Sequence, residues 1–265
     1  MINKPIGIFD SGIGGLSIFN AVVKELPNEN IIYFADSNRC PYGGKTQNEV
    51  KEISKSIIIY LKNVYDIKLA IVACNTATVA SIQYLREEFP DILFVGVVPV
   101  IKPASMLSKT KNIACFATEV TVGSKAQTEL IDNFSKDVQV HNVACHGLVE
   151  LVEQGLFDND VTKNKLKEYI APVVEKNIDI LALGCTHYTF LRDQIENLLP
   201  EGTLVLDSNK PVAEQTRRLL RDKKLLNERT KPKYEFLVNG DPNKFKEIVR
   251  PFLNSYFKTP KQVLL

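Results

Sequence analysis

Two segments of this chain align without a gap, and each ends in a cysteine. The first reads Asp66-Ile-Lys-Leu-Ala-Ile-Val-Ala-Cys74, and the second reads Asn177-Ile-Asp-Ile-Leu-Ala-Leu-Gly-Cys185. Each aliphatic run predicts a buried strand with the cysteine at its carboxyl end. Because ligands of open α/β sheets bind beyond these ends, the repeat predicts two similar half-molecules that face one site.

Strand and helix signals alternate along the whole chain. Aliphatic runs predict strands at 6–9, 31–35, 69–73, 91–95, 112–116, 138–143, 178–183, 203–206 and 234–238. Amphipathic spacing and capping residues predict helices at 12–26, 46–64, 76–88, 147–154, 160–176 and 189–199, and further helices after Pro211 and from Pro242. This alternation predicts an α/β fold with two similar open parallel sheets, each covered on both faces.

The restart of the pattern after residues 97–103 suggests two domains. We place the first domain at residues 1–97 together with 208–265, and the second at 98–207. Segment 97–103 is predicted to cross between them. The tail ends in a helix that Asp241 caps, with Pro242 at its first position, and we expect the tail to return to the first domain.

Composition and charge exclude several classes of protein. The chain has 265 residues, of which 45% are hydrophobic and 24% are charged, as in folded globular proteins. A net charge of +2 gives no electrostatic case for nucleic acid. The basic stretch 217–233 also contains Asp222 and Glu228, which favours a solvent-exposed helix face.

The sequence shows no membrane or secretion signal. There is no apolar run of signal-peptide or membrane-spanning length. The five cysteines, an odd number, favour reduced thiols in the cytoplasm. We read Cys115 as a core residue and Cys40 as a loop residue.

The turn Asp10-Ser-Gly-Ile-Gly-Gly15 lies between a predicted strand and a predicted helix, where backbone amides can bind an anion. A dinucleotide site is one alternative, with Asp36 near the position of a ribose-binding acid. The glycine spacing disfavours it, because Ser17 stands where the third glycine of G-x-G-x-x-G is required. A carboxylate at Asp10 fits better beside a thiol or an ammonium group.

Thiols need help to act as bases at neutral pH. An ordinary thiol pKa is about 8.5, and a helix N-terminus or a neighbouring acid–base group makes the thiolate more accessible. Asp10 is a candidate partner for Cys74, and His187 is one for Cys185. A zinc site that uses Cys145 and His146 as further ligands is an alternative, but no C-x-x-C pair occurs. Serine chemistry is disfavoured because no G-x-S-x-G elbow occurs.

Taken together, these motifs resemble the bacterial glutamate racemases. The matching segments are Asp10-Ser-Gly with Gly14-Gly-Leu, Asp36-Ser, Pro41-Tyr-Gly43, Ala73-Cys-Asn-Thr-Ala77 and Gly184-Cys-Thr-His187. They occur in order, within a likeness that runs from about Ile6 to Gly240-Asp-Pro. Two departures are Cys145-His-Gly in place of the usual Cys-Pro, and Ala117 where glycine usually precedes the Thr118 position.

The resemblance implies a fold and a reaction. Two α/β domains related by an approximate two-fold would enclose glutamate in the cleft between them. The reaction would interconvert L- and D-glutamate without a cofactor or a metal and supply D-glutamate for peptidoglycan. By this resemblance, Cys74 deprotonates D-glutamate and Cys185 deprotonates L-glutamate, each thiol serving the opposite face of Cα.

The resemblance also implies roles for other residues. Asp10 would assist Cys74, His187 would assist Cys185, and Glu153 would tune the site. The residues that match substrate-holding positions are Asp10, Ser11, Tyr42, Gly43, Asn75, Thr76, Thr118, Thr121 and Thr186. A homodimer is left open, and the short lead before the first strand predicts no N-terminal segment of the kind with which some relatives bind a cell-wall precursor.

Three alternatives remain at this point. The first is a racemase of aspartate or another acidic amino acid on the same fold. The second is a non-catalytic binding module, whose usual signature would be the loss of one cysteine, although both are present here. The third is the dinucleotide oxidoreductase.

Overall fold

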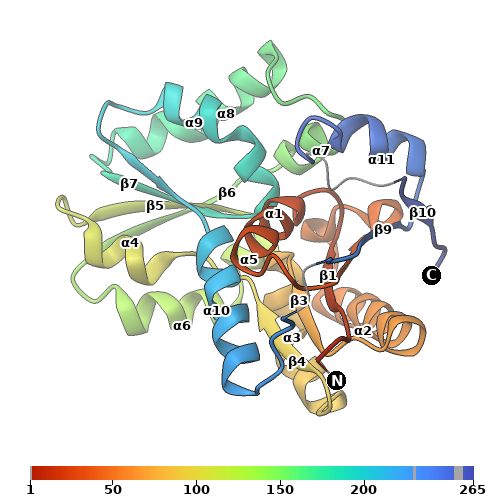
Figure 1. Cartoon of the computed structure of the whole chain (residues 1–265). Helices are drawn as coiled ribbons and strands as arrows, with labels where there is room; N and C mark the ends of the chain where they lie inside the picture. The colour runs from red at the N-terminus through yellow and green to blue at the C-terminus, as the bar shows by residue number, and fades with distance from the viewer. Residues whose placement is uncertain (1, 229–230, 254–258) are drawn as a thin grey trace. The chain divides into compact units, whose positions relative to one another are not determined.

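The computed structural model describes residues 2–228, 231–253 and 259–265. The chain forms two compact units, one of Met1–Val97 with Asn209–Leu265 and the other of Val98–Ser208. Each unit is built on one parallel sheet (Figure 1). The prediction of two parallel-sheet α/β domains is therefore confirmed.

In the described part of the first unit, six parallel strands pair in the order β10-β9-β2-β1-β3-β4. Their bounds are β1 Ile6–Asp10, β2 Ile31–Ala35, β3 Leu69–Val72, β4 Leu93–Gly96, β9 Tyr234–Val238 and β10 Lys261–Gln262. The C-terminal segment thus adds β9 beside β2 and β10 beside β9.

Helices cover both faces of this first sheet. They are α1 Leu16–Glu25, α2 Gln47–Tyr65, α3 Asn75–Glu88, α10 Asn209–Asp222 and α11 Pro242–Val249, with 3₁₀ turns η1 Ser37–Arg39 and η2 Tyr42–Gly44. The β1-to-β2 connection runs across the sheet in the opposite direction to the next two connections. Right-handed crossovers therefore put α1 on one face and α2 and α3 on the other. Accordingly, α1 packs against α10, and α2 packs against α3.

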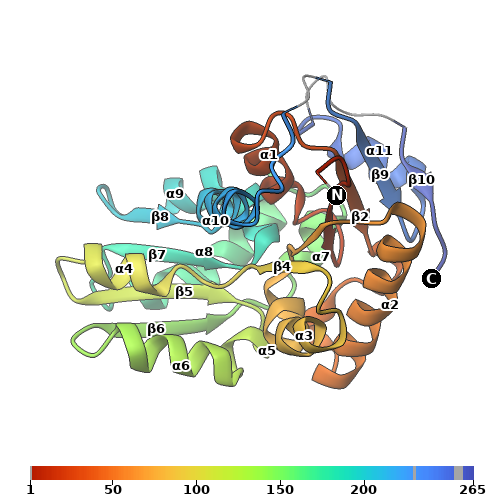
Figure 2. The same cartoon turned by 60° about the horizontal axis from the view of Figure 1, so that its bottom comes forward.

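The second unit repeats this topology. Its described strands pair in the order β6-β5-β7-β8, all parallel, and Figure 2 shows them side by side. The strands are β5 Asn112–Ala117, β6 Gln139–Ala144, β7 Ile180–Gly184 and β8 Leu204–Leu206. The helices are α4 Ile101–Leu107, α5 Glu119–Val122, α6 Lys125–Phe134, α7 Leu148–Glu153, α8 Asp160–Val174 and α9 Arg192–Leu198, with the 3₁₀ helix η3 Thr186–Leu191.

The repeated strand order creates a switch point in each sheet. The first strand of each unit lies between the second and the third. The connections to the strands on its two sides therefore run in opposite directions across the sheet. Ligands of open α/β sheets bind at such points. Cys74 follows β3 and Cys185 follows β7, which are the third strands of the two units.

Some elements differ from the sequence-based expectation. The helix expected at 12–26 begins only at Leu16, because the preceding glycines form a turn. Segment 101–107, partly assigned to the crossover, is helical, as is 125–134, whose one fully buried residue is Gln127. The helix expected at 189–199 is 3₁₀ until Leu191 and α-helical from Arg192.

The basic stretch 217–233 is helical only in its first part. The helix α10 ends at Asp222. Residues 229–230 of this stretch lie outside the described residues. None of the helices in the described ranges combines the length and hydrophobicity needed to cross a lipid bilayer.

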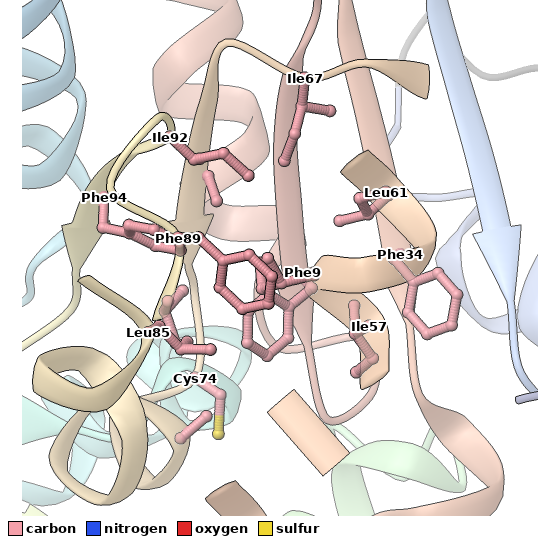
Figure 3. Packing of buried hydrophobic residues seen from close by; sticks show 14 of the residues in the cluster. Phe9, Phe34, Ile57, Leu61, Ile67, Cys74, Leu85, Phe89, Ile92 and Phe94 are labelled. Carbon is pink, nitrogen blue, oxygen red and sulfur yellow. The ribbon is translucent and has the colours of Figure 1, made fainter. Parts of the chain in front are cut away.

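A large apolar cluster fixes the first sheet against α2 and α3. Figure 3 shows Phe9 of β1 packed among side chains of these helices and the neighbouring strands, with Cys74 at one end of the cluster. Fully burying one such side chain contributes about 1.5–3 kcal/mol. The strand ends that carry the candidate site therefore rest on a well-packed core.

Gly15 allows α1 to begin close to the ends of β1 and β3. A Cβ at this position would lie 2.8 Å from the Cβ of Asp10 and 2.9 Å from the Cβ of Ala73. Any larger residue would push α1 away from these strand ends. Close approach explains why the turn ends in glycine here.

A buried ion pair joins distant segments of the first unit. The Lys68 ammonium group donates to Glu29 Oε2 at 2.6 Å, and both side chains are almost fully buried. It also donates to the carbonyls of Ile2 and Leu225 at 2.7 and 2.8 Å. Glu29 Oε1 in turn accepts from the Asn227 backbone N–H at 2.8 Å.

We predict that Lys68→Met destabilises the protein by about 3–5 kcal/mol, because it leaves the Glu29 charge buried without its partner. The matched control is Lys62→Met, which removes an ion pair to Asp91 whose side chains are 37% and 60% exposed. Such an exposed pair contributes about 1 kcal/mol or less. Urea unfolding followed by circular dichroism measures both, and equal losses would contradict the prediction.

Candidate active site

The ends of β1 and β3 bring three predicted site residues together. The Ala73 backbone N–H donates to the Phe9 carbonyl at 2.8 Å, so the two strand ends are hydrogen-bonded neighbours. The Cys74 thiol donates to Ser11 Oγ at 3.8 Å. Asp10 Oδ1 accepts the Gly12 N–H at 2.8 Å, which fixes the carboxylate within the glycine-rich turn.

Cys74 also begins a helix. It is the N-cap of the 14-residue helix α3, and its side chain makes no capping hydrogen bond. The positive end of the helix dipole stabilises negative charge at this position.

The two residues after Cys74 are buried in the first turn of α3. Asn75 Nδ2 donates to the Val97 carbonyl at 3.4 Å. The Val97 N–H donates to Thr78 Oγ1 at 3.0 Å. Thr76 is 2% exposed. These hydrogen bonds join the start of α3 to Val97, the residue that follows β4.

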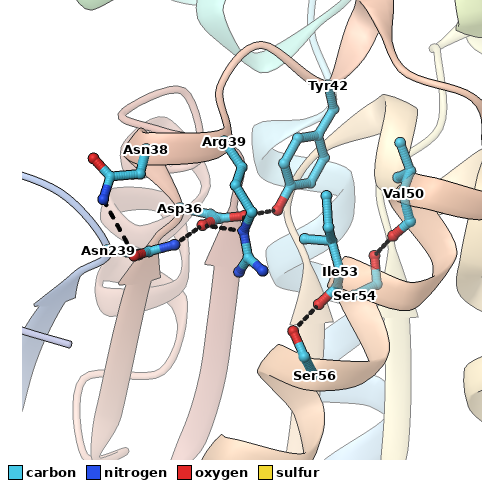
Figure 4. A network of polar contacts seen from close by, with 9 residues as sticks. All are labelled: Asp36, Asn38, Arg39, Tyr42, Val50, Ile53, Ser54, Ser56 and Asn239. Atoms are coloured by element: carbon cyan, nitrogen blue, oxygen red, sulfur yellow. Dashed lines mark hydrogen bonds and ion pairs between the residues drawn. The ribbon is translucent and has the colours of Figure 1, made fainter. Parts of the chain in front are cut away.

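Tyr42 and Gly43 lie in η2, in the segment that follows β2. Figure 4 shows Tyr42 pointing to Asp36, to which its hydroxyl donates a hydrogen bond. Arg39 Nε donates to both carboxylate oxygens of Asp36, at 2.9 and 2.7 Å. Asn239 Nδ2 donates to Asp36 Oδ1 at 2.5 Å.

The pKa values of this cluster follow from its burial. Burial raises the pKa of Asp36 despite the hydrogen bonds from Tyr42, Asn239 and Arg39 that lower it. Burial and the adjacent Asp36 carboxylate raise the pKa of Tyr42 well above its ordinary value. Tyr42 therefore remains a neutral phenol whose hydroxyl donates a hydrogen bond to the carboxylate.

In the second unit, Cys185 has a histidine–carboxylate pair beside it. Cys185 Sγ lies 4.0 Å from His187 Nδ1, and His187 Nε2 lies 2.7 Å from Glu153 Oε1. His187 is 2% exposed, and the Glu153 side chain is 17% exposed. With Nε2–H donating to Glu153, the Nδ1 lone pair is available to the Cys185 proton.

Two threonines follow β5, the strand equivalent to β1, and Thr118 stands where Ser11 stands in the first unit. Thr118 follows β5 and is the N-cap of α5. Its Oγ1 lies 3.1 Å from Thr121 Oγ1, and both side chains are buried. Thr186 opens η3 beside Cys185 and is 4% exposed. These hydroxyls can donate to a carboxylate without adding formal charge.

The second unit holds two further buried thiols, Cys115 and Cys145. Burial raises the pKa of Cys115 to about 12. Burial also raises the pKa of Cys145 far above its ordinary value. The backbone of the Cys145-His146 segment is fixed by Tyr188, which donates to the Cys145 carbonyl at 2.9 Å, and by Tyr169, which donates to the His146 carbonyl at 2.9 Å.

Each unit thus gathers its own share of the predicted residues. Asp10, Ser11 and Cys74 meet in the first unit, and Cys185, His187 and Glu153 meet in the second. The partners Arg39 and Asn239 of Asp36 were not expected from the sequence. The available signal was the predicted strand 234–238, whose carboxyl end delivers Asn239.

Comparisons with known proteins agree on one family. The sequence model of the Asp/Glu/hydantoin racemase family matches residues 6–216. The chain is 43% identical to a glutamate racemase of Herpetosiphon aurantiacus over 94% of this chain and 97% of that protein.

Solved structures give the same result. The fold is similar to a glutamate racemase isoform of Bacillus anthracis, with a TM-score of 0.88, 29% identity and coverage of 100% of this chain and 98% of that one. It is also similar to a glutamate racemase of Francisella tularensis in complex with D-glutamate, with a TM-score of 0.86, 30% identity and the same coverage.

We predict that Cys115 and Cys145 resist alkylation in the folded protein. The nucleophile is the thiolate, and with a pKa of about 12 only about one Cys115 in 10⁴ is ionised at pH 8. Peptide mass spectrometry after iodoacetamide treatment should find both unlabelled in buffer and labelled in urea. Cys40, which is half-buried in a loop, is the internal control for labelling of folded protein. Labelling of Cys115 in buffer at its rate in urea would refute this.

Proposed function

The chain belongs to the Asp/Glu/hydantoin racemase family, and we propose from this membership that it interconverts L-glutamate and D-glutamate. The observation that carries the proposal is the pair of cysteines at equivalent strand ends, each with an acid–base group of its own unit nearby. Inversion at Cα requires one base and one acid on opposite faces of the carbon. Two similar half-sites supply such a pair.

The proposed reaction is two proton transfers. The Cys74 thiolate removes the Cα proton of D-glutamate and becomes a thiol. The Cys185 thiol delivers its proton to the opposite face of the carbanion and becomes a thiolate. The product is L-glutamate, and the protonation states of the two sulfurs have exchanged, which is the state required for the reverse reaction. No electrons leave the system, and the proposal includes no cofactor or metal.

The partners of the two thiols act differently. Asp10, fixed by the Gly12 N–H, assists proton transfer at Cys74. His187 accepts the Cys185 proton at Nδ1, and the Glu153 carboxylate stabilises the imidazolium that forms. This arrangement makes Cys185 competent to deprotonate L-glutamate.

Neutral donors hold the substrate in this proposal. They are Ser11, Tyr42, Gly43, Asn75, Thr76, Thr118, Thr121 and Thr186, together with the Asp10 carboxylate for the ammonium group. Hydroxyl, amide and backbone donors bind carboxylates without a strong positive field. Such a site leaves the basicity of the thiolates largely intact.

We also propose the cellular role that is typical of glutamate racemases, the supply of D-glutamate for peptidoglycan. Reduced thiols are required by the mechanism, which supports action in the cytoplasm. The high identity to glutamate racemases favours glutamate over aspartate. An aspartate preference would be revealed by testing a panel of acidic amino acids as substrates and monitoring each reaction by circular dichroism.

We predict that Cys74→Ala and Cys185→Ala each reduce racemisation of glutamate by at least about 10³-fold, because each removes a group that transfers a proton in every turnover. The measurement is the circular dichroism of L- or D-glutamate with purified protein and no added cofactor. Exchange of the Cα proton in D₂O, followed by NMR, checks whether proton removal itself is lost.

The matched control is Cys115→Ala, which removes a third buried thiol that lies in the core. We expect it to keep activity close to the wild-type value with some loss of stability. Substantial turnover by either active-site variant would contradict the two-base mechanism. Folded wild-type protein that exchanges no Cα proton would instead favour the binding module.

A further inference from the structure

We propose that Asn239 is a positioning residue for the substrate loop, which we define as residues 36–45. It acts through Asp36 on Tyr42, and it lies outside the segment 6–216 that matches the family model. The inference rests on the proposed function, in which Tyr42 and Gly43 hold glutamate.

The hydrogen bonds form a continuous path from the C-terminal segment to the substrate loop. Asn239 Nδ2 donates to Asp36 Oδ1 at 2.5 Å, and the Tyr42 hydroxyl donates to Asp36 Oδ2. Figure 4 shows Asp36 between these two side chains, with Arg39 beside it. Asn239 and Asp36 are 3% and 0% exposed, so no bulk water replaces these donors.

The strand register brings Asn239 to this place. Val238 of β9 pairs with Ala35 of β2, and the pairing continues one residue further because the Asn239 N–H donates to the Ala35 carbonyl at 2.8 Å. The Asn38 N–H donates to the Asn239 carbonyl at 2.6 Å. The side chain of Asn239 therefore meets the first residue of the substrate loop.

The next residue shows how closely the two segments approach. Gly240 has φ of +158°, and a Cβ there would lie 3.1 Å from the Cβ of Ser37. The β9 end and the start of the substrate loop are thus in direct contact. A change at Asn239 therefore acts directly on the substrate loop.

The expected consequence concerns substrate binding. In the proposed function Tyr42 and Gly43 of the substrate loop hold glutamate, and the hydrogen bond from the Tyr42 hydroxyl to Asp36 fixes the position of this loop. Without the Asn239 amide, the buried Asp36 carboxylate loses one donor and holds Tyr42 less firmly. An interaction that binds the ground state and the transition state alike raises KM when it is lost and leaves kcat nearly unchanged.

The test compares Asn239→Ala with Gln262→Ala. Gln262 Nε2 donates to the Gly240 carbonyl at 2.9 Å, so it holds the same turn without touching Asp36. For Asn239→Ala we expect KM for glutamate to rise about tenfold, the size of one lost hydrogen bond to a charged group, with kcat within about threefold. Gln262→Ala should leave KM unchanged.

Two further measurements separate positioning from general stability. Hydrogen exchange of peptides that cover residues 36–45 should accelerate in Asn239→Ala and not in Gln262→Ala. In a double-mutant cycle, Asn239→Ala should add little to the KM of Tyr42→Phe, because both act through Asp36. Additive effects on KM, or exchange equal in the two single variants, would overturn the inference.

Failure of this inference can be told apart from failure of the proposed function. Active wild-type protein with unchanged KM in Asn239→Ala overturns the positioning role alone. Wild-type protein without racemase activity overturns the proposed function, and hydrogen exchange of the substrate loop then decides whether Asn239 positions it.

Discussion

The parallel pairing of the first and third strands in each unit is the constraint on which the candidate site depends. β1 pairs with β3, and β5 pairs with β7, so the residues that follow these strands emerge side by side. In the first unit this brings Asp10 close to Cys74, although the two residues are far apart in the sequence. The same topology in the second unit places Cys185 beside the threonines that follow β5.

The two units share one strand order, but different acid–base groups lie near their cysteines. In the first, the carboxylate comes from the end of β1 itself, and the helix α3 adds its dipole at Cys74. In the second, β5 ends without an acidic residue, and Cys185 opens a 3₁₀ helix instead. In the proposed function His187, supported by Glu153 from α7, takes that role.

Local patterns predicted most of the fold because they record the physics of each element. The strand ending at Cys74 is uniformly aliphatic, as a strand buried on both faces requires. The helix expected at 46–64 forms as α2, which begins with a capping box between Thr46 and Glu49. The helix α6 escaped prediction because it has few apolar residues and the residue it buries is the polar Gln127. The helix α1 begins later than expected because the glycines before it form a turn, and Gly15 lies close to the strand ends.

The candidate site was predictable to the extent that its residues follow strand ends. Cys74, Cys185 and Asp10 could be named from the chain alone, whereas Tyr42, Thr121 and Glu153 came from resemblance to a family, and their roles stay predictions. The partners of Asp36 were missed because Asn239 is 203 residues away and reaches it only through the β2–β9 register.

The Asp36 cluster shows why a C-terminal strand matters to a site at the other end of the sequence. A carboxylate buried at 0% exposure requires several donors, and no single loop supplies them. Arg39 and Tyr42 come from the loop itself, while the third donor is Asn239, the residue that follows β9. The C-terminal segment therefore has two effects. It adds strands to the sheet, and in the proposed role of Asn239 it also fixes the geometry of the substrate loop.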